Sequence, residues 1–450
     1  MNAVQHLKFK NLEAIPPEDQ RSFIPYGRQW IDEEDIKAVE NVLRSDYLTQ
    51  GPKVREFEEA FAQYVGSRYA VAVCSGTAAL HLACLAADLG PGDEILTSPI
   101  TFAATANSAL YVGAKPAFID IDPETFNLDV KTLETYLEEK TSPNRGRQSS
   151  TSGEPYPRAV IPVHFGGLPC DMPAIQSIAQ KHGLVVIEDA CHALGATYRH
   201  QETANGKQRS KGNKWIKVGS CMHSDMTVFS FHPVKHITTG EGGMVTTNSA
   251  EFYQRLVLFR NHGIARDVDK FSDELLAMDS ENQLSGFDRR MMPSWYYEMQ
   301  GLGFNYRIND IQCALGISQL KKIDYFIRRR RFIAEQYLKF LDSIPCFSIQ
   351  IEPEGYKSSY HLYVLCLDAQ TKIKRDQVIN ILKQMGIGTQ VHYIPVYQHP
   401  FYRQLGYEEQ KCSNAENYFK NCFSIPMYPA MSNEDINRVM NALEKVGGML

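Results

Sequence analysis

Short apolar runs alternate with segments of helical length along the first half of the chain. Runs such as AVAV after Tyr69 and AFI after Lys115 lack polar alternation, as expected of strands covered on both faces. Between such runs lie segments of helical length, for example SGTAALHLACLAADLG and TFAATANSALYVG. The repeated order of strand, helix and strand predicts an α/β fold with a large, mostly parallel sheet and right-handed crossovers.

The same patterns divide the chain into parts. We expect an N-terminal arm (1–22), a large domain (23–263), an insert or linker (264–304), and a smaller C-terminal α+β domain with a connecting helix (305–450). A helix capped by Asp32 and a second helix from Val54 to Tyr64 precede the first core strand.

Several polar or charged stretches interrupt or flank this pattern. Three of them are 141–155, 199–215 and 265–294, and the first two are expected to be solvated loops. The arginine run 328–331 predicts an exposed helix face, because the surrounding charge is balanced.

Composition narrows the class of protein. A hydrophobic content of 43%, a charged content of 22% and a net charge of −5 are typical of a soluble globular protein without a nucleic-acid or membrane surface. No apolar run has the length of a membrane span, and the N-terminus lacks the apolar region of a secretory signal. The ten cysteines show no metal-binding spacing, so we expect no metal and reduced thiols in a cytoplasmic protein.

One lysine lies between two apolar strands in the stretch SDMTVFSFHPVKHITTGEGGMVT. Lys235 follows the first strand, and Gly240, Gly242 and Gly243 let the backbone turn and approach a ligand closely. A desolvated lysine has a lowered pKa, which makes its amine a nucleophile towards carbonyl groups. An isolated lysine is usually exposed, so this interpretation needs support from other residues.

Three further features provide that support. Asp189 ends the apolar strand GLVVIED, and Ser75-Gly76-Thr77 begins a helix after a strand, where a phosphate is readily bound. Phe102 follows a third strand and offers an aromatic face. Alone, each has a structural explanation as a helix cap or core residue. Together with Lys235 they match the requirements of pyridoxal phosphate: an amine, an acid for the pyridinium nitrogen, a phosphate cup and a stacking ring.

Five motifs carry a resemblance to a known family: SGTAAL, TFAATANSALYVGAKPAFIDID, IEDACHALGA, FSFHPVKHITTGEGGMV and GFNYRINDIQCALG. They resemble the DegT/DnrJ-type family of pyridoxal-phosphate-dependent nucleotide-sugar aminotransferases. The resemblance covers about residues 23–445 apart from the inserts. It implies the fold type I of these transferases, similar to aspartate aminotransferase, and a homodimer with shared active sites. IPYGRQWIDEEDIKAVENVL and QVHYIPVY are similar to the pseudaminic-acid branch. Enzymes of that branch move the amino group of L-glutamate to carbon 4 of a UDP-linked 4-keto-6-deoxy-N-acetyl hexose.

The resemblance also implies residue roles. Lys235 would form the Schiff base and act as the catalytic amine, with Asp189 as the pyridinium partner. The other cofactor contacts would be Ser75, Gly76, Thr77, Phe102, His192, Ser230 and, from the neighbouring subunit, Asn305. The nucleotide sugar would contact Tyr26, Asp46, Tyr47, Leu48, Thr49, Gly76, Ser230, Asn305, His392, Tyr393, Ile394 and Pro395.

Alternatives remain at this point. The chain could aminate another nucleotide-linked keto sugar, or be a pyridoxal-phosphate-binding regulatory protein without turnover. A dinucleotide-dependent dehydrogenase has little support, since no GxGxxG fingerprint occurs. Arg307 is one candidate for a contact with the carboxylates of glutamate, with a structural role equally open.

Overall fold

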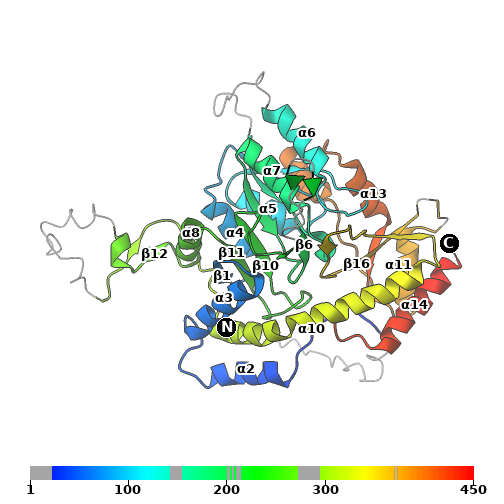
Figure 1. Ribbon diagram of the computed structural model, residues 1–450, viewed down its shortest axis with the longest axis horizontal. Coiled ribbons are helices and arrows are strands. Elements are labelled where there is room, and N and C mark those ends of the chain that lie inside the picture. Colours follow the sequence, from blue (N-terminus) through cyan, green and yellow to red (C-terminus); the bar gives the residue numbers. More distant parts are fainter. Residues whose placement is uncertain are drawn as a thin grey trace, which may run out of the picture.

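The computed structural model describes residues 23–141, 155–199, 203–204, 207–208, 214–271, 294–368, 370–371 and 373–449. Its centre is a seven-stranded sheet in the order β1-β11-β10-β5-β4-β2-β3 (Figure 1). The strands are β1 (Tyr69–Val73), β2 (Asp93–Thr97), β3 (Lys115–Phe118), β4 (Tyr156–Ile161), β5 (Val185–Asp189), β10 (Met226–Ser230) and β11 (Gly243–Thr247). Only β11 runs antiparallel to its neighbours, so the predicted mostly parallel sheet is confirmed.

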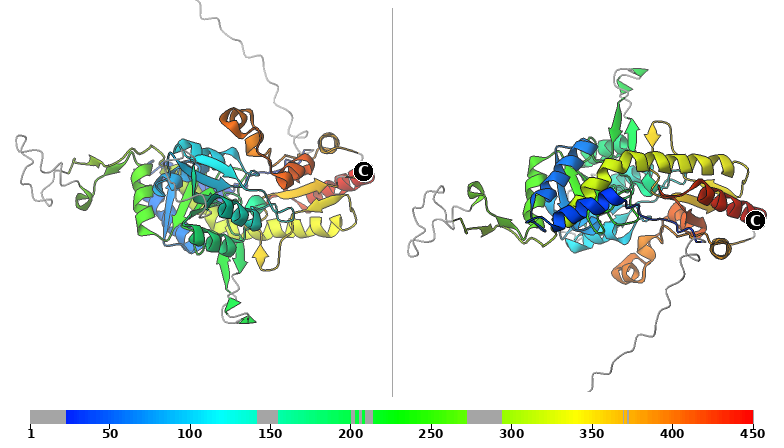
Figure 2. Two further views of the ribbon diagram at one scale, coloured as in Figure 1. Left: turned by 90° about the horizontal axis from the view of Figure 1, so that it is seen from above. Right: turned by 90° about the horizontal axis from the view of Figure 1, so that it is seen from below.

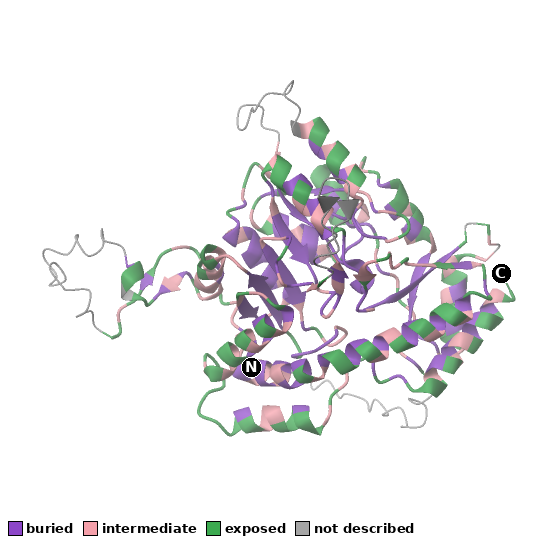
Figure 3. Cartoon of the chain, in the orientation of Figure 1, coloured by how far each residue is buried: buried purple, intermediate pink, exposed green. Residues whose placement is uncertain are grey.

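Helices cover both faces of this sheet, because successive strand residues point to opposite sides. Val71 and Val73 pack with α4 (Gly76–Ala86), α5 (Ala103–Tyr111) and α8 (Ala250–Arg260). Ala70 and Ala72 pack on the other face with α3 (Pro52–Val65), α6 (Val130–Thr141) and α7 (Met172–His182). The buried residues in Figure 3 accordingly concentrate on the central strands. This burial on both faces explains why the apolar runs of the sequence do not alternate with polar residues.

The C-terminal part has its own core beside the sheet. One helix of 32 residues, α10 (Asp310–Leu341), begins against the large sheet and continues into the second core (Figure 2). This core also contains the antiparallel sheet β14 (Phe347–Ile349), β16 (Tyr363–Leu367) and β17 (Cys422–Ile425), together with α11 (Arg375–Gln384) and α14 (Asn433–Gly447). The domain boundaries given above stay a prediction.

The remaining elements are short or peripheral. The predicted cap is confirmed, since the Asp32 carboxylate accepts hydrogen bonds from the backbone at the start of α2 (Glu33–Leu43). The others are η2 (Phe165–Gly167), β6 (Thr197–Arg199), β7 (Thr203–Ala204), β8 (Lys207–Gln208), β9 (Trp215–Lys217), β12 (Ile264–Ala265), η3 (Val268–Lys270), β13 (Glu298–Met299), β15 (Tyr356–Lys357), η5 (Val396–Gln398), α12 (Pro400–Tyr402), η6 (Arg403–Tyr407) and α13 (Ser413–Asn421).

Two expectations about polar segments are corrected. The stretch 199–215 is not purely a loop, because its ends pair as β6 and β9 and its middle carries the β7–β8 pair. The run 328–331 is not a uniformly exposed face, because Arg330 is only 1% exposed. The arm 1–22 and most of 141–155 and 265–294 lie outside the described residues.

Some classes of site can be checked in the described part of the chain. No described helix is both long and apolar enough to cross a membrane. No group of three or more histidine, cysteine or acidic side chains within the described ranges could hold a metal ion. All ten cysteines are free, and seven of them are buried.

Candidate active site

The predicted site residues follow the carboxyl ends of three strands that run in the same direction. Asp189 ends β5, Ser230 ends β10, and Ser75 follows β1 after Cys74. Since β5, β10 and β1 lie near one another in the sheet, their ends meet at one edge. A Cβ added to Gly76 would lie 2.9 Å from the Cβ of Ser230 and 3.4 Å from the Sγ of Cys191. The structure therefore brings Gly76, Ser230 and the neighbourhood of Asp189 together.

The start of α4 forms a narrow cup. The Ser75 hydroxyl accepts a hydrogen bond from the backbone N–H of Ala78. This side chain therefore caps the helix, which was the structural explanation open for it from the sequence. A Cβ on Gly243 would lie 2.5 Å from the Ser75 carbonyl oxygen and 2.8 Å from the Gly76 nitrogen, so only glycine fits there. Gly240 has a φ of 79°, which gives the turn that sequence predicted for the glycine run.

Lys235 lies in the connection between β10 and β11, as predicted. Its backbone N–H donates to the His232 carbonyl oxygen at 2.8 Å, which fixes a tight turn. The residue is half-buried. Burial lowers the pKa of the Lys235 amine, while the negative charges that Cys191 and Asp189 can carry act in the opposite direction. The desolvated amine expected from the sequence is thus present, with an acid near it.

Asp189 is held in a fixed orientation. The carboxylate is 5% exposed and accepts hydrogen bonds from the Thr105 hydroxyl at 2.6 Å and the Cys191 N–H at 3.1 Å. A carboxylate offers about four acceptor positions, so further capacity remains for a donor in the site. Asp189 does not cap a helix through these contacts, because its carboxylate is bonded to Thr105 of α5 and to the backbone of its own turn.

Aromatic and imidazole rings surround this pair. The Nε2 of His192 lies 3.2 Å from the Tyr393 hydroxyl, while its buried Nδ1 has no hydrogen-bond partner in the described structure. Burial, followed by the Lys235 charge, lowers the pKa of His192 well below its usual value, so this imidazole is neutral. Phe102 is 62% exposed, and its ring centroid lies 6.3 Å from that of Tyr393. Its ring is therefore open to a ligand rather than part of the core.

Other predicted residues divide into two groups. Tyr26 packs against His392 with ring centroids 5.5 Å apart, and burial lowers the pKa of His392 to about 3. The Lys235 charge also lowers the pKa of His392, and Tyr393 reaches the site through its contact with His192. Ile394 and Pro395 follow these residues in the chain, and Ile394 is 42% exposed.

Asn305 and the segment 46–49 are placed differently. The segment 46–49 is exposed and lies beside the start of α10, where the Leu48 carbonyl accepts from the Asp310 N–H. Asn305 is also exposed and forms a backbone bridge with Asn261. Arg307 donates to the Asn261 side chain at 2.6 Å, which supports its structural role. No contact found among the described residues joins these positions to Lys235.

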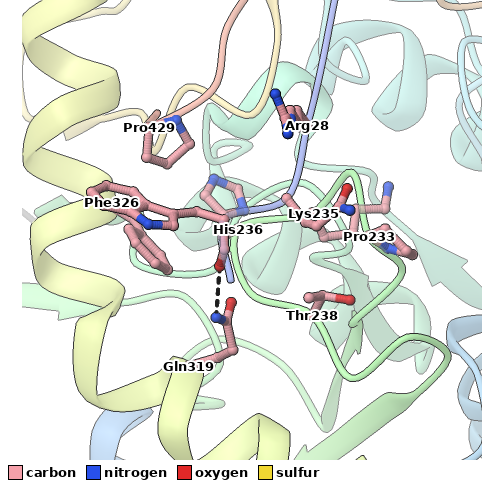
Figure 4. A pocket seen from close by; sticks show the side chains of 10 residues that line it. Arg28, Pro233, Lys235, His236, Thr238, Gln319, Phe326 and Pro429 are labelled. Atoms are coloured by element: carbon pink, nitrogen blue, oxygen red, sulfur yellow. Dashed lines mark hydrogen bonds between the residues drawn. The ribbon is translucent and has the colours of Figure 1, made fainter. Parts of the chain in front are cut away.

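Sequence reasoning missed several residues of the site. Thr105 and Cys191 contact Asp189, and His236 and His361 lie beside Lys235 and His192. In the sequence, two of these residues could have been found by their position: Cys191 lies between Asp189 and His192, and His236 follows Lys235. A small cavity of about 10 Å³ is lined by Lys235 together with Arg28, Trp30 and Gln319 (Figure 4). The Gln319 amide there donates to the Trp30 carbonyl at 2.9 Å.

These residues fit pyridoxal phosphate. The glycine-lined cup at Gly76 has no room for a side chain, the unpartnered His192 Nδ1 is a free polar group in the site, and the oriented Asp189 faces a desolvated lysine. The acid, the amine, the cup and the exposed ring together offer the kinds of contact that this cofactor needs.

Comparison with known proteins agrees with this chemistry. Residues 29–444 match the DegT/DnrJ/EryC1/StrS aminotransferase family. The chain is 39% identical over 428 residues to the spore coat polysaccharide biosynthesis protein SpsC of Bacillus subtilis, covering 94% of this chain and 97% of that protein. It is 38% identical over 421 residues to a UDP-4-amino-4,6-dideoxy-N-acetyl-beta-L-altrosamine transaminase of Campylobacter jejuni, covering 93% and 96%.

Solved structures give the same result. The aminotransferase PseC of Helicobacter pylori, involved in pseudoaminic acid biosynthesis, has a TM-score of 0.78 and 29% identity over 95% of this chain and all of that one. The putative sugar aminotransferase Spr1654 of Streptococcus pneumoniae in its PMP form has a TM-score of 0.76 and 27% identity over 94% and 99%. The chain therefore has the fold type I of pyridoxal-phosphate-dependent transferases and belongs to the DegT/DnrJ/EryC1/StrS aminotransferase family.

Proposed function

We propose that this chain is a pyridoxal-phosphate-dependent nucleotide-sugar 4-aminotransferase. It moves the amino group of L-glutamate to the 4-keto group of a UDP-linked 4-keto-6-deoxy-N-acetyl hexose. The observation that carries the proposal is the half-buried Lys235 amine beside the oriented Asp189 carboxylate, next to the cup at Gly76 and Ser230. The cofactor would be joined covalently to Lys235.

The bound cofactor supplies an electron sink for the pair of electrons left when a proton leaves carbon. The Lys235 amine, when it is not joined to the cofactor, would be the base. Because burial lowers its pKa, a larger share of the amine is neutral near pH 7, so it could take the proton from the α-carbon of glutamate. The return half-reaction with the keto sugar uses the same amine in reverse.

Other residues keep the charges in place. Asp189, held by Thr105 and the Cys191 N–H, would accept a hydrogen bond from the pyridinium nitrogen and stabilise its positive charge. The N–H groups at the start of α4 and the Ser230 hydroxyl would bind the phosphate. The neutral His192 adds no second positive charge beside Lys235.

The sugar substrate is inferred from similarity. The Campylobacter transaminase named above supports amination in the altrosamine series. The Bacillus protein SpsC is equally similar and is named for spore coat polysaccharide synthesis, which favours a second candidate, another nucleotide-linked keto sugar.

The partner would be a second copy of the chain in a homodimer with shared active sites. The exposed positions of Asn305 and of the segment 46–49 support this, because both were expected to contact cofactor or sugar. Those contacts would be made with the neighbouring subunit rather than within one chain.

A panel of nucleotide-linked 4-keto sugars, incubated with glutamate and read by mass spectrometry, tests the substrate. The UDP-linked N-acetyl sugar should gain an amine, and amination of only another keto sugar would favour the second candidate. Glutamate alone should shift the absorbance of the loaded enzyme; a protein that binds the cofactor without turnover would not shift. Lys235→Arg should abolish both signals, and an active Lys235→Arg variant would refute the assignment of the base.

A further inference from the structure

The segment 358–361, between β15 and β16, lies directly beneath the site. Ser359 and His361 are buried, and Tyr360 adopts a φ of 49°, unusual for a residue with a side chain. A Cβ on Gly167 would lie 2.8 Å from both the Ser359 Oγ and the Tyr360 nitrogen. This close approach shows that the segment is tightly enclosed and that its backbone position is specified from several sides.

The segment contacts a close neighbour in the chain of each predicted catalytic residue, Lys235 and Asp189. Its Ser359 carbonyl lies 3.2 Å from the Nε2 of His236, the residue that follows Lys235 in the turn. The Ser359 hydroxyl lies 3.2 Å from the carbonyl oxygen of His192, three residues after Asp189. A shift of this segment would therefore move the supports of Lys235 and of Asp189 together.

His361 adds ring contacts to the same two neighbours. Its ring centroid lies 4.4 Å from that of His192 and 5.6 Å from that of His236. Burial lowers the pKa of all three imidazoles well below the usual value, with further lowering from Lys235 or Arg330. The three rings are therefore neutral, and their mutual contacts carry no charge repulsion.

Arg330, on α10, holds the segment from behind. It is 1% exposed, and its guanidinium donates to the carbonyl oxygens of Tyr360 at 3.1 Å, His361 at 3.2 Å and Met427 at 2.8 Å. Burial lowers its pKa to about 9. Among the described residues, its hydrogen-bond partners are carbonyl oxygens and not carboxylates, and its Nε has no partner.

A buried guanidinium without a counter-ion is costly for stability, and apolar replacements of buried charges are often neutral or stabilising. Its three bonds go to backbone of two segments of the C-terminal part, at residues 360–361 and 427. We propose that Arg330 is a positioning residue of the active site, which locks the segment 358–361 beneath Lys235 and His192. The inference rests on the proposed function.

The test compares Arg330→Met with the matched control Arg329→Met. Arg329 is the preceding residue on the same helix and also donates to a carbonyl, that of Met431, outside the segment. In Arg330→Met, we expect faster hydrogen exchange of the peptide 358–367 and a single-turnover reaction with glutamate slowed by about tenfold or more, since small misplacements of catalytic groups cost that much. The KM for glutamate should stay within about twofold, and Arg330→Lys should restore part of the rate.

Ser359→Ala provides a second measurement if Arg330→Met fails to fold. It removes only the hydroxyl, which donates to the His192 carbonyl at 3.2 Å and to the Gly167 carbonyl at 3.5 Å. The glutamate reaction should slow by about threefold. The inference is overturned if these variants react with glutamate as fast as wild type and Arg329→Met. It is also overturned if hydrogen exchange rises while the reaction rate stays the same, because the segment would then hold nothing that the chemistry needs.

The proposed function fails separately. Borohydride reduction followed by mass spectrometry detects a cofactor joined to Lys235 without any turnover. A wild-type protein that forms this adduct but ignores glutamate would refute the donor alone, and the rate of adduct formation would then compare the variants. A wild-type protein that forms no adduct refutes both.

Discussion

Replacing Gly76 with alanine tests the phosphate cup with a single methyl group. Gly76 is the first residue of α4 and has no positive φ, so its backbone accepts alanine. The added Cβ would lie 2.9 Å from the Ser230 Cβ, 3.3 Å from its Oγ and 3.4 Å from the Cys191 Sγ. The methyl group therefore enters the cup between the two groups that line it.

The magnitude follows from these distances. Optimal carbon contacts are about 3.5–4.0 Å, so Ser230 must move by several tenths of an ångström or more. Overpacking of this kind costs about 1–3 kcal/mol, and the better helix propensity of alanine returns up to about 1 kcal/mol. The cofactor-free protein should lose at most about 3 kcal/mol of unfolding free energy. Cofactor binding should weaken by about tenfold or more, because Ser230 is displaced and the methyl group obstructs the N–H groups of the cup, and tenfold corresponds to about 1.4 kcal/mol.

The assay is a fluorescence titration of cofactor-free protein with pyridoxal phosphate, beside urea unfolding of the same samples. Gly90→Ala is the control, since its Cβ would meet nothing closer than 3.8 Å. Equal affinities for Gly76→Ala, Gly90→Ala and wild type would refute the placement of the phosphate at this cup. Equal loss of affinity in both variants would show a general effect of added methyl groups.

Three further predictions concern buried groups. Because burial lowers the folded-state pKa of Lys235, protonation opposes folding at neutral pH, and this penalty fades as pH rises towards about 10.4. Cofactor-free Lys235→Met should thus melt above wild type at pH 7, with a smaller difference at pH 10; no difference at pH 7 would contradict this. Burial favours a raised pKa for Glu188, but bonds from His164, Ser224 and Thr227 outweigh it and lower the pKa. Glu188→Gln should lose about 1–3 kcal/mol in urea unfolding at pH 7, and the loss should shrink below about pH 4 as the wild-type carboxylate protonates; a constant loss would argue against the ionised form. Tyr393→Phe should slow the glutamate reaction several-fold by releasing the His192 Nε2, and an unchanged rate would remove this bond from the mechanism.

Local patterns predicted the sheet and its functional edge because both depend on short stretches of sequence. The apolar runs that become β1, β5 and β10 are buried on both faces, and polar residues at their ends therefore meet at one edge. Asp189, Ser230 and Gly76 could be placed together for this reason. The close approach of Gly243 to Ser75 follows from the same β1–β11 pairing.

Contacts between distant segments could not be predicted in this way. Thr105 donates to Asp189 because the first turn of α5 lies within hydrogen-bond reach of the end of β5, and no spacing in the sequence links residues 105 and 189. Arg330 shows the limit most clearly. A run of four arginines is typical of a solvated face, and the burial of one of them depends on carbonyl groups from residues 360, 361 and 427. A helix periodicity gives the direction of a side chain, but not the polarity of the loop that will cover it.

The positions of Asn305 and of the segment 46–49 bear on whether a second copy of the chain completes the site. The segment 46–49 lies on exposed surface beside the N-terminal end of α10, with Tyr47 57% and Leu48 47% exposed. Asn305 is also exposed and pairs with the backbone of Asn261. Large apolar side chains that are exposed next to a polar loop are better explained by contact with another protein surface than by exposure to water. If a second copy covers them, Tyr47→Glu should weaken the dimer measured by sedimentation and reduce activity, with part of the activity returning at high protein concentration. Activity that is independent of concentration in a monomeric Tyr47→Glu variant would show that one chain contains the complete site.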